Sequence, residues 1–288
     1  MTSQNAKCEA DMGEKTIVMT GAAGGVAAMI RPYLRTQYRL RLSDRQGVEG
    51  NLAEGETWVA ADLGDRAALH DLVAGAYGVV HLGGQSVEAD WDTVRSANIE
   101  GLFNILEACR EHKVPRFIFA SSNHAMGFYQ RTSRVGTQQA VRPDTLYGVS
   151  KAFGEALSSL YADKHALRAM SIRIGNVGEK PADHRRLSIW LHPEDLAQLV
   201  SIGLDHPDIH HAIVYGASHN ERAWWDNGAA YALGYRPRHK AEDHLDYAMA
   251  EEAKIPEDPI GGVLQGGTFC SQGFDGDLER TLRANRPQ

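Results

Sequence analysis

The stretch Ile17-Val18-Met19-Thr20-Gly21-Ala22-Ala23-Gly24-Gly25-Val26-Ala27 decides the fold. It runs from an apolar strand through a tight turn into a helix, with the spacing G-x-x-G-x-x-A. Glycines let the backbone approach a pyrophosphate, and the helix N-terminus offers free N–H groups and the positive end of a dipole. A plain strand–helix connection is the alternative. The candidates for dinucleotide contact in this turn are Gly21, Ala23, Gly24, Gly25 and Val26.

Short apolar runs alternate with amphipathic segments on the C-terminal side of this turn. Strands are predicted at 16–19, 38–42, 58–60, 78–82, 116–119, 169–174 and 212–215. Helical patterns fall between them, at 26–34, 66–74, 93–112 and 145–164. Such alternation predicts an α/β, Rossmann-type fold with a doubly wound parallel sheet. Ligands of these folds bind beyond the carboxyl ends of the strands.

The amino-acid composition changes after Ile174, where glycine, proline, histidine and tryptophan become frequent. We therefore expect a dinucleotide-binding domain over 15–174 and a smaller C-terminal substrate lobe over 175–288. A polar, loose tail is expected at 1–14.

Composition narrows the classes of partner and compartment. The chain has 288 residues, is 43% hydrophobic and carries a formal net charge of -7, which argues against nucleic-acid or anionic-membrane partners. Its cysteines, Cys8, Cys109 and Cys270, are few and far apart, as expected for free thiols in a reducing compartment. No run approaches a membrane span, and the polar N-terminus does not resemble a signal peptide. We expect a cytoplasmic protein.

Two acidic residues follow predicted strands where a dinucleotide would need them. Asp44 ends the second strand about 20 residues after Gly21, the position of a carboxylate that binds ribose hydroxyls. Its charge would repel a 2′-phosphate and so favours NAD over NADP, while Arg45 keeps NADP open. Asp62 follows the third strand, within reach of an adenine edge.

A phenol and an ammonium group lie one helical turn apart at Tyr147 and Lys151. A free tyrosine has a pKa near 10, but a lysine cation and an oxidised nicotinamide favour the phenolate, which could accept a proton from a substrate hydroxyl. Ser122 could hydrogen-bond that hydroxyl, and Asn98 could orient a water or the lysine. A solvated helix face would have the same spacing. The order of the motifs, from glycine turn to Tyr-Lys pair, favours the catalytic interpretation.

With these motifs in this order, the chain resembles an extended short-chain dehydrogenase/reductase of the NAD-dependent epimerase/dehydratase group from Ile17 onward. Within that group it is most similar to the uronate dehydrogenases. The stretches that carry this resemblance are HLGGQSVE at 81–88, FASSNH at 119–124, LYGVSK at 146–151, RRLSIW at 185–190, YGAS at 215–218, WWDN at 224–227 and QGGTF at 265–269. The last four lie in the predicted substrate lobe and are the most particular.

The resemblance implies roles for individual residues. The implied catalytic triad is Ser122, Tyr147 and Lys151. The implied substrate contacts are Ser86, Asn123, His124, Asn176 and Arg185. Leu63, Leu82, Gly83 and Gly84 join the implied NAD contacts, together with Tyr147 and Lys151.

Two of the implied substrate residues carry most of the specificity. Arg185 would hold a carboxylate through its guanidinium fork, although its neighbour Arg186 is a rival for that role on composition alone. Family members have a small serine where this chain has Asn176, so the preference between glucuronate and galacturonate stays open.

The implied activity is NAD-dependent oxidation of hexuronic acids at C1 to the aldarolactone, by a homo-oligomer. One alternative is a nucleotide-sugar epimerase or dehydratase, although the part of the chain after Ile174 is small for a nucleotide-sugar site. Another is a non-catalytic NAD-sensing protein, which would not need the Tyr-Lys pair. Several histidines match no metal-binding template, so no metal is expected: His184, His192, His206, His210 and His211.

Overall fold

A computed structural model describes residues 15–47 and 52–284, so the predicted tail at 1–14 lies outside the described residues. Seven strands form one parallel sheet in the order β3-β2-β1-β4-β5-β6-β9. They are β1 (Thr16–Thr20), β2 (Arg39–Asp44), β3 (Glu56–Ala60), β4 (Gly78–His81), β5 (Arg116–Ser122), β6 (Arg168–Ile174) and β9 (His211–Gly216). The predicted doubly wound parallel sheet is confirmed.

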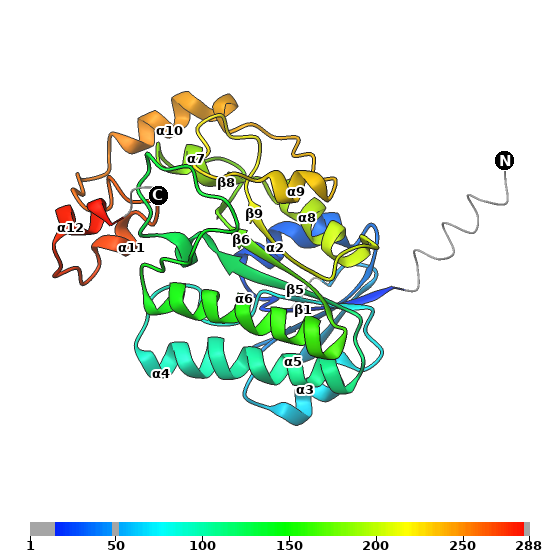
Figure 1. The fold of residues 1–288 in the computed structure, drawn as a ribbon. Coiled ribbons are helices and arrows are strands. Elements are labelled where there is room, and N and C mark those ends of the chain that lie inside the picture. Colours follow the sequence, from blue (N-terminus) through cyan, green and yellow to red (C-terminus); the bar gives the residue numbers. More distant parts are fainter. Residues whose placement is uncertain (1–14, 48–51, 285–288) are drawn as a thin grey trace.

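Helices cover both faces of the sheet (Figure 1). One face carries α2 (Gly25–Leu34) and α8 (Pro193–Asp205), which pack against each other. The other carries α3 (Arg66–Val73), α5 (Gly101–Glu111) and α6 (Leu146–His165). No helix within 15–47 and 52–284 is long and apolar enough to cross a membrane.

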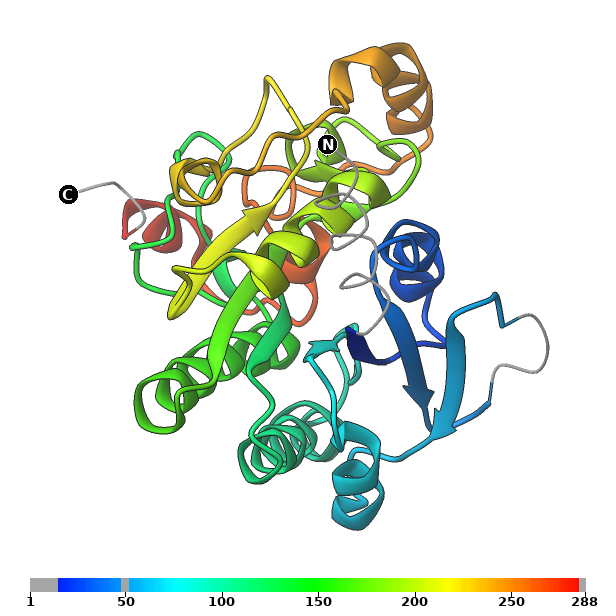
Figure 2. The same cartoon turned by 90° about the vertical axis from the view of Figure 1, so that its right-hand side faces the viewer.

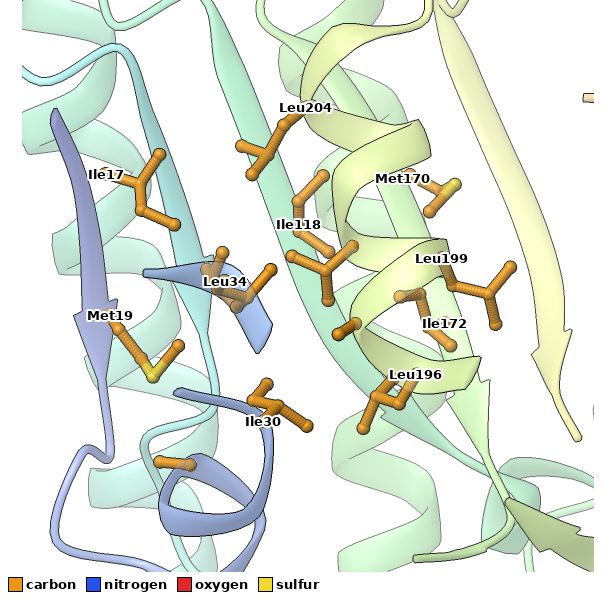
Figure 3. Packing of buried hydrophobic residues seen from close by; sticks show 14 of the residues in the cluster. Ile17, Met19, Ile30, Leu34, Ile118, Met170, Ile172, Leu196, Leu199 and Leu204 are labelled. Atoms are coloured by element: carbon orange, nitrogen blue, oxygen red, sulfur yellow. The ribbon is translucent and has the colours of Figure 1, made fainter. Parts of the chain in front are cut away.

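The core on the α2/α8 side shows why these segments fold as they do. Apolar residues spaced by three or four positions put one face of each helix against the strands. Figure 3 shows this packing for Ile17, Met19, Ile30, Leu34, Ile118, Met170, Ile172, Leu196, Leu199 and Leu204, all of which are buried. Burying each such side chain contributes about 1.5–3 kcal/mol to the stability of the fold. The packed core therefore holds the strands, and with them the strand ends, in fixed positions.

Segments on the C-terminal side of Ile174 complete this sheet. β9 pairs in parallel with β6, so Val214 lies beside Ile172. Figure 2 shows the yellow β9 and the blue β1 and β2 in different parts of the sheet. The other elements on the C-terminal side of Ile174 are β7 (Asn176–Val177), α7 (Arg186–Ile189), β8 (Trp190–Leu191), α9 (Gly228–Ala232), η3 (Ala241–His244), α10 (Leu245–Glu252), α11 (Thr268–Ser271) and α12 (Leu278–Arg283).

The helix predicted at 93–112 is observed as three consecutive segments. α4 (Trp91–Val94) begins at Asp90, whose carboxylate accepts the N–H of Thr93. A π-helical segment, η1 (Arg95–Glu100), follows and leads into α5. Such π-helical turns within α-helices often occur at functional sites. Here the segment contains Asn98, which is buried beside the cavity described next.

Candidate active site

A cavity of about 650 Å³ opens where β1 to β4 end. It is lined by ten of the residues predicted to bind the dinucleotide: Gly21, Gly24, Gly25, Val26, Asp44, Asp62, Leu63, Leu82, Gly83 and Gly84. Ser86, predicted to contact substrate, lines the same cavity. Three predicted cofactor contacts, Ala23, Tyr147 and Lys151, are not among the lining residues. The backbone N–H of Ala23 donates to Asp44 Oδ2 across 3.2 Å.

The glycine turn has the shape that a pyrophosphate needs. Gly21 has a φ of +69°, and a Cβ there would lie 2.7 Å from the backbone of Leu82 and Gly83. A Cβ on Gly25 would meet nothing within 4 Å, so open space lies over the start of α2. The N-cap of α2, Gly24, provides no side-chain cap, which leaves the first N–H groups for a ligand. These observations fit NAD.

Asp44 is held in place at the end of β2. Its two carboxylate oxygens accept the backbone N–H groups of Ala23 (3.2 Å) and Arg45 (2.7 Å). Asp62 similarly accepts the N–H of Gly64 across 2.7 Å. Both carboxylates therefore have fixed positions at the cavity, and each keeps lone pairs for a ligand's hydroxyl or amino groups.

The triad residues come from two elements that meet beside this cavity. Tyr147 and Lys151 occupy successive turns of α6, which Thr145 begins by accepting the N–H of Gly148. Ser122 ends β5, and all three side chains are buried. The Lys151 ammonium donates to the carbonyl of Ala120 (2.8 Å) and lies 5.4 Å from the centre of the Tyr147 ring.

Burial sets the pKa values of the tyrosine and the lysine. Burial raises the pKa of Tyr147 above its ordinary value, a hydrogen bond with Ser122 opposes this rise, and the Asp144 charge adds to it. Burial lowers the pKa of Lys151 to about 8. Desolvation is thus the largest effect on the Tyr147 pKa, which lies above its ordinary value, whereas the sequence predicts that Lys151 favours the phenolate.

The polar residues after β5 form a short helical turn, η2 (Asn123–Met126). Asn123 is buried, and its Nδ2 has no hydrogen-bond partner among the described residues. An unpaired buried donor is costly, so this amide is suited to a ligand oxygen. The His124 ring stacks on Phe269, with 3.9 Å between ring centres, and forms a T-shaped pair with the Tyr147 ring.

Arg185 and Arg186 have different surroundings. Arg186 forms an ion pair with Asp183. Within the described part of the chain, Arg185 has a neutral partner instead: its Nε and Nη2 donate to the carbonyl of Gln265 at 3.0 and 2.7 Å. Burial lowers the pKa of Arg185 to about 10, and the charges of Arg186 and Arg131 act in the same direction. A half-buried cation without an acidic partner is suited to an anionic ligand.

Asn176 lies in the short strand β7, directly after β6. It pairs with Trp190 of β8. Because β8 directly follows α7, which begins after Arg185, this pairing connects Asn176 to the segment that carries Arg185. Asn176 is partly exposed. Its amide can both donate and accept hydrogen bonds, as a sugar hydroxyl requires.

Two contacts beside the site were not predicted. Glu88 accepts the N–H groups of Leu146 (3.2 Å) and Tyr147 (2.9 Å), and so caps the catalytic helix from a distant loop. Asn98 bonds to the backbone of Gln85 and to Ser150, whereas a water or Lys151 is the partner that the sequence suggests. Both side chains tie the loop that carries Ser86 to α6. Neither contact has a local sequence signal, because each joins segments far apart in the chain.

The histidine His192 has a structural environment. Its Nδ1 accepts the N–H of Glu194 at the start of α8, and its ring stacks on that of His239 with 3.4 Å between centres. The ligand-type atoms of His192, Glu194 and His239 lie within 4.8 Å of one another. The two rings are nearly parallel, at 17°, so their in-plane lone pairs do not converge on one point. This geometry favours capping and packing.

Known proteins resemble this chain in sequence and in fold. The uronate dehydrogenase of Pseudomonas putida is 41% identical over 258 residues, which cover 89% of this chain and 96% of that protein. The solved glucuronic acid dehydrogenase of Chromohalobacter salexigens is 42% identical, with a TM-score of 0.85 and coverage of 89% and 97%. A variant of the Agrobacterium tumefaciens uronate dehydrogenase, solved in complex with NAD, is 38% identical, with a TM-score of 0.84 and the same coverage.

The match to a family covers the glycine turn, the acids at the end of β2 and after β3, the triad and Arg185. Residues 17–190, more than half of the chain, match the family described as NAD dependent epimerase/dehydratase. The chain therefore belongs to the NAD-dependent epimerase/dehydratase family.

Proposed function

We propose that this protein oxidises hexuronic acids, galacturonate or glucuronate, at C1 to the aldarolactone with NAD as the electron acceptor. One observation carries the proposal: the 265–269 segment contacts both an arginine that has no ion-pair partner in the described residues and the aromatic group beside the tyrosine–lysine pair. Arg185 bonds to the backbone of Gln265, and Phe269 in the same segment stacks on His124 beside Tyr147. A carboxylate site and a proton-transfer site are thus joined by one short segment.

The residues that line the cavity would hold NAD at the ends of the strands. The start of α2 and the glycine turn are suited to its pyrophosphate, and Asp44 to its adenosine ribose. When bound, NAD supplies the acceptor for the hydride that leaves C1 of the substrate. In this proposal residues 15–174 bind the cofactor and 175–288 supply the substrate lobe, although β9 of the second part completes the sheet and α8 covers one of its faces.

The substrate is oriented before any proton moves. Arg185 binds the uronate carboxylate through its guanidinium, and Ser86, Asn123, His124 and Asn176 contact the ring hydroxyls. Ser122 and Tyr147 hold the anomeric hydroxyl, whose proton passes to the Tyr147 oxygen as the C1–O bond gains double-bond character. The lactone produced this way opens to the aldaric acid in water without a further protein group.

Lys151 has an electrostatic task in this scheme. Its ammonium is held by the Ala120 carbonyl and faces the Tyr147 ring, so its position is fixed. With a pKa of about 8, the group is mostly charged at neutral pH. Its charge favours the phenolate at the moment when Tyr147 must accept a proton.

The proposal is tested by mixing purified protein with NAD and either galacturonate or glucuronate. We expect NADH absorbance to rise with at least one acid and to rise far less with galactose, which lacks the carboxylate. No signal with either acid would defeat the proposal. Tight calorimetric binding of a UDP-sugar instead would favour the epimerase alternative. The ratio of kcat/KM with galacturonate to kcat/KM with glucuronate measures the substrate preference. In this proposal Asn176 contributes to that preference.

Replacing Asp44 with serine should shift cofactor preference from NAD toward NADP. The change removes charged hydrogen bonds to a ribose, worth about 1.5–3 kcal/mol, and the repulsion of a 2′-phosphate. The ratio of kcat/KM with NAD to kcat/KM with NADP should fall about tenfold or more. The matched control is Asp71→Ser, which removes an exposed acid from α3. An unchanged ratio in Asp44→Ser would remove Asp44 from the proposed cofactor site.

Compartment and assembly are also part of the proposal. Cys109 and Cys270 are buried free thiols, as expected for a protein of the reducing cytoplasm, while Cys8 lies outside the described residues. A homo-oligomer is proposed by analogy with the family alone. Light scattering of the purified protein measures its assembly directly.

A further inference from the structure

A buried carboxylate behind His124 has no role in the scheme above. Asp144 immediately precedes the N-cap of α6, and its side chain is 0% exposed. Its Oδ2 lies 2.6 Å from His124 Nδ1, and its Oδ1 accepts the Thr145 hydroxyl at 2.9 Å. A carboxylate is costly to bury, so a group placed this way needs these partners.

The surrounding chain leaves space for this carboxylate and for little else. A Cβ on either Gly127 or Gly266 would collide with the Asp144 side chain. The backbone N–H of Asp144 also donates to the carbonyl of His124 at 3.3 Å. The carboxylate therefore has one place to lie, and in that place it touches the imidazole.

The pairing determines which ring nitrogen is free. An ionised carboxylate only accepts hydrogen bonds, so His124 Nδ1 must carry the proton that joins it to Asp144. In the neutral ring, Nε2 is then an acceptor. Among the described residues no hydrogen bond to Nε2 is found, and the ring is held on one face by Phe269.

We propose that Asp144 is a positioning residue that fixes Nε2 of His124 as the acceptor for a hydroxyl of the sugar substrate. The proposal deepens the function proposed above and rests on it. Asp144 acts through His124 and touches neither substrate nor cofactor. A substrate hydroxyl that donates to Nε2 is then held near Tyr147, because the His124 and Tyr147 ring centres are 5.9 Å apart.

A double-mutant cycle tests this dependence. Asp144→Asn should lower kcat/KM for the preferred uronate about tenfold to a hundredfold, mainly through KM, because the amide can also donate to Nδ1 and reverse the tautomer. His124→Ala should cost at least as much, and the double variant should cost no more than His124→Ala alone. Additive losses would overturn the proposal.

A matched control separates positioning from general stability. Asp195 is also a buried acid, bonded to Ser218 and to backbone N–H groups of the 238–239 segment. Asp195→Asn should lower the melting temperature and leave kcat/KM near the parent value. An equal loss of kcat/KM in Asp195→Asn and Asp144→Asn would mean that Asp144 is merely structural.

Nitrogen NMR of the unmodified protein with isotope-labelled histidine provides a second test that requires no folded Asp144 variant. We expect the His124 ring to carry its proton on Nδ1, with the signals assigned by their absence in His124→Gln. A proton on Nε2 at neutral pH would overturn the positioning role even if uronates are oxidised. If the parent oxidises no uronate but Nδ1 is protonated, the proposed function fails and the tautomer assignment stands.

Discussion

Replacing Tyr147 with phenylalanine will lower kcat for uronate oxidation by about 10²–10⁴-fold, the usual contribution of a positioned proton acceptor. The Kd for NAD should change far less than kcat, because the ring keeps its place beside His124 and only one of the many implied NAD contacts, the hydroxyl, is lost. Steady-state kinetics and calorimetric titration with NAD measure the two quantities. A loss confined to kcat identifies a group that acts in the transition state.

Tyr161→Phe is the matched control for this change. Tyr161 belongs to the same helix and is buried, but its hydroxyl donates to Glu107, away from the cavity. Removing that hydroxyl should lower stability by about 1 kcal/mol and leave kcat unchanged. Parent-like turnover in Tyr147→Phe would exclude Tyr147 as the proton acceptor and would support the NAD-sensing alternative.

The pH dependence of kcat/KM, compared between the parent and Tyr147→Phe, gives an independent readout. Burial raises the Tyr147 pKa, so the phenol is protonated at neutral pH and its phenolate fraction grows about tenfold per pH unit below that pKa. In the parent, kcat/KM should therefore increase with pH. The increase should flatten above about pH 8, where Lys151 loses its charge. In Tyr147→Phe this dependence should disappear.

The parts of the fold that sequence could predict are those set by local pattern. The glycine turn at 21–25, the apolar runs of the strands and the helix that begins after Thr145 each have a periodicity or a cap within a few residues. The cavity follows from them, because parallel strands end at one edge. Its lining therefore contains most of the predicted cofactor residues.

The rest depends on contacts between distant segments, for which a single sequence has no period. Glu88 caps α6 from a loop, and the backbone carbonyl of Gln265 accepts hydrogen bonds from the Arg185 guanidinium. Asp144 meets His124 only because two glycines leave room for it. The pKa of Tyr147 was likewise not evident, because burial depends on the packed structure and the Tyr-x-x-x-Lys spacing does not encode it.

Replacing Arg185 with glutamine will lower kcat/KM for the uronate by roughly 30-fold to 4,000-fold. Removing one partner of a buried, hydrogen-bonded charge pair costs about 2–5 kcal/mol, which corresponds to that range of fold-change. Arg185→Lys should lose less than Arg185→Gln, because it keeps the charge but loses the fork that matches a carboxylate. Initial rates over a range of uronate concentrations measure both variants.

Two comparisons make the carboxylate assignment specific. Arg186→Gln alters the adjacent residue, whose guanidinium is already paired with Asp183, and should leave kcat/KM for the uronate near the parent value. The weak oxidation of a neutral aldose should be nearly the same in Arg185→Gln and the parent, since that substrate has no carboxylate to lose. A loss with the neutral aldose as large as with the uronate would mean that Arg185 holds the 265–269 segment in place and binds no substrate charge. The Gln265 carbonyl would then be its functional partner, and the anion site would have to be sought elsewhere in the lobe.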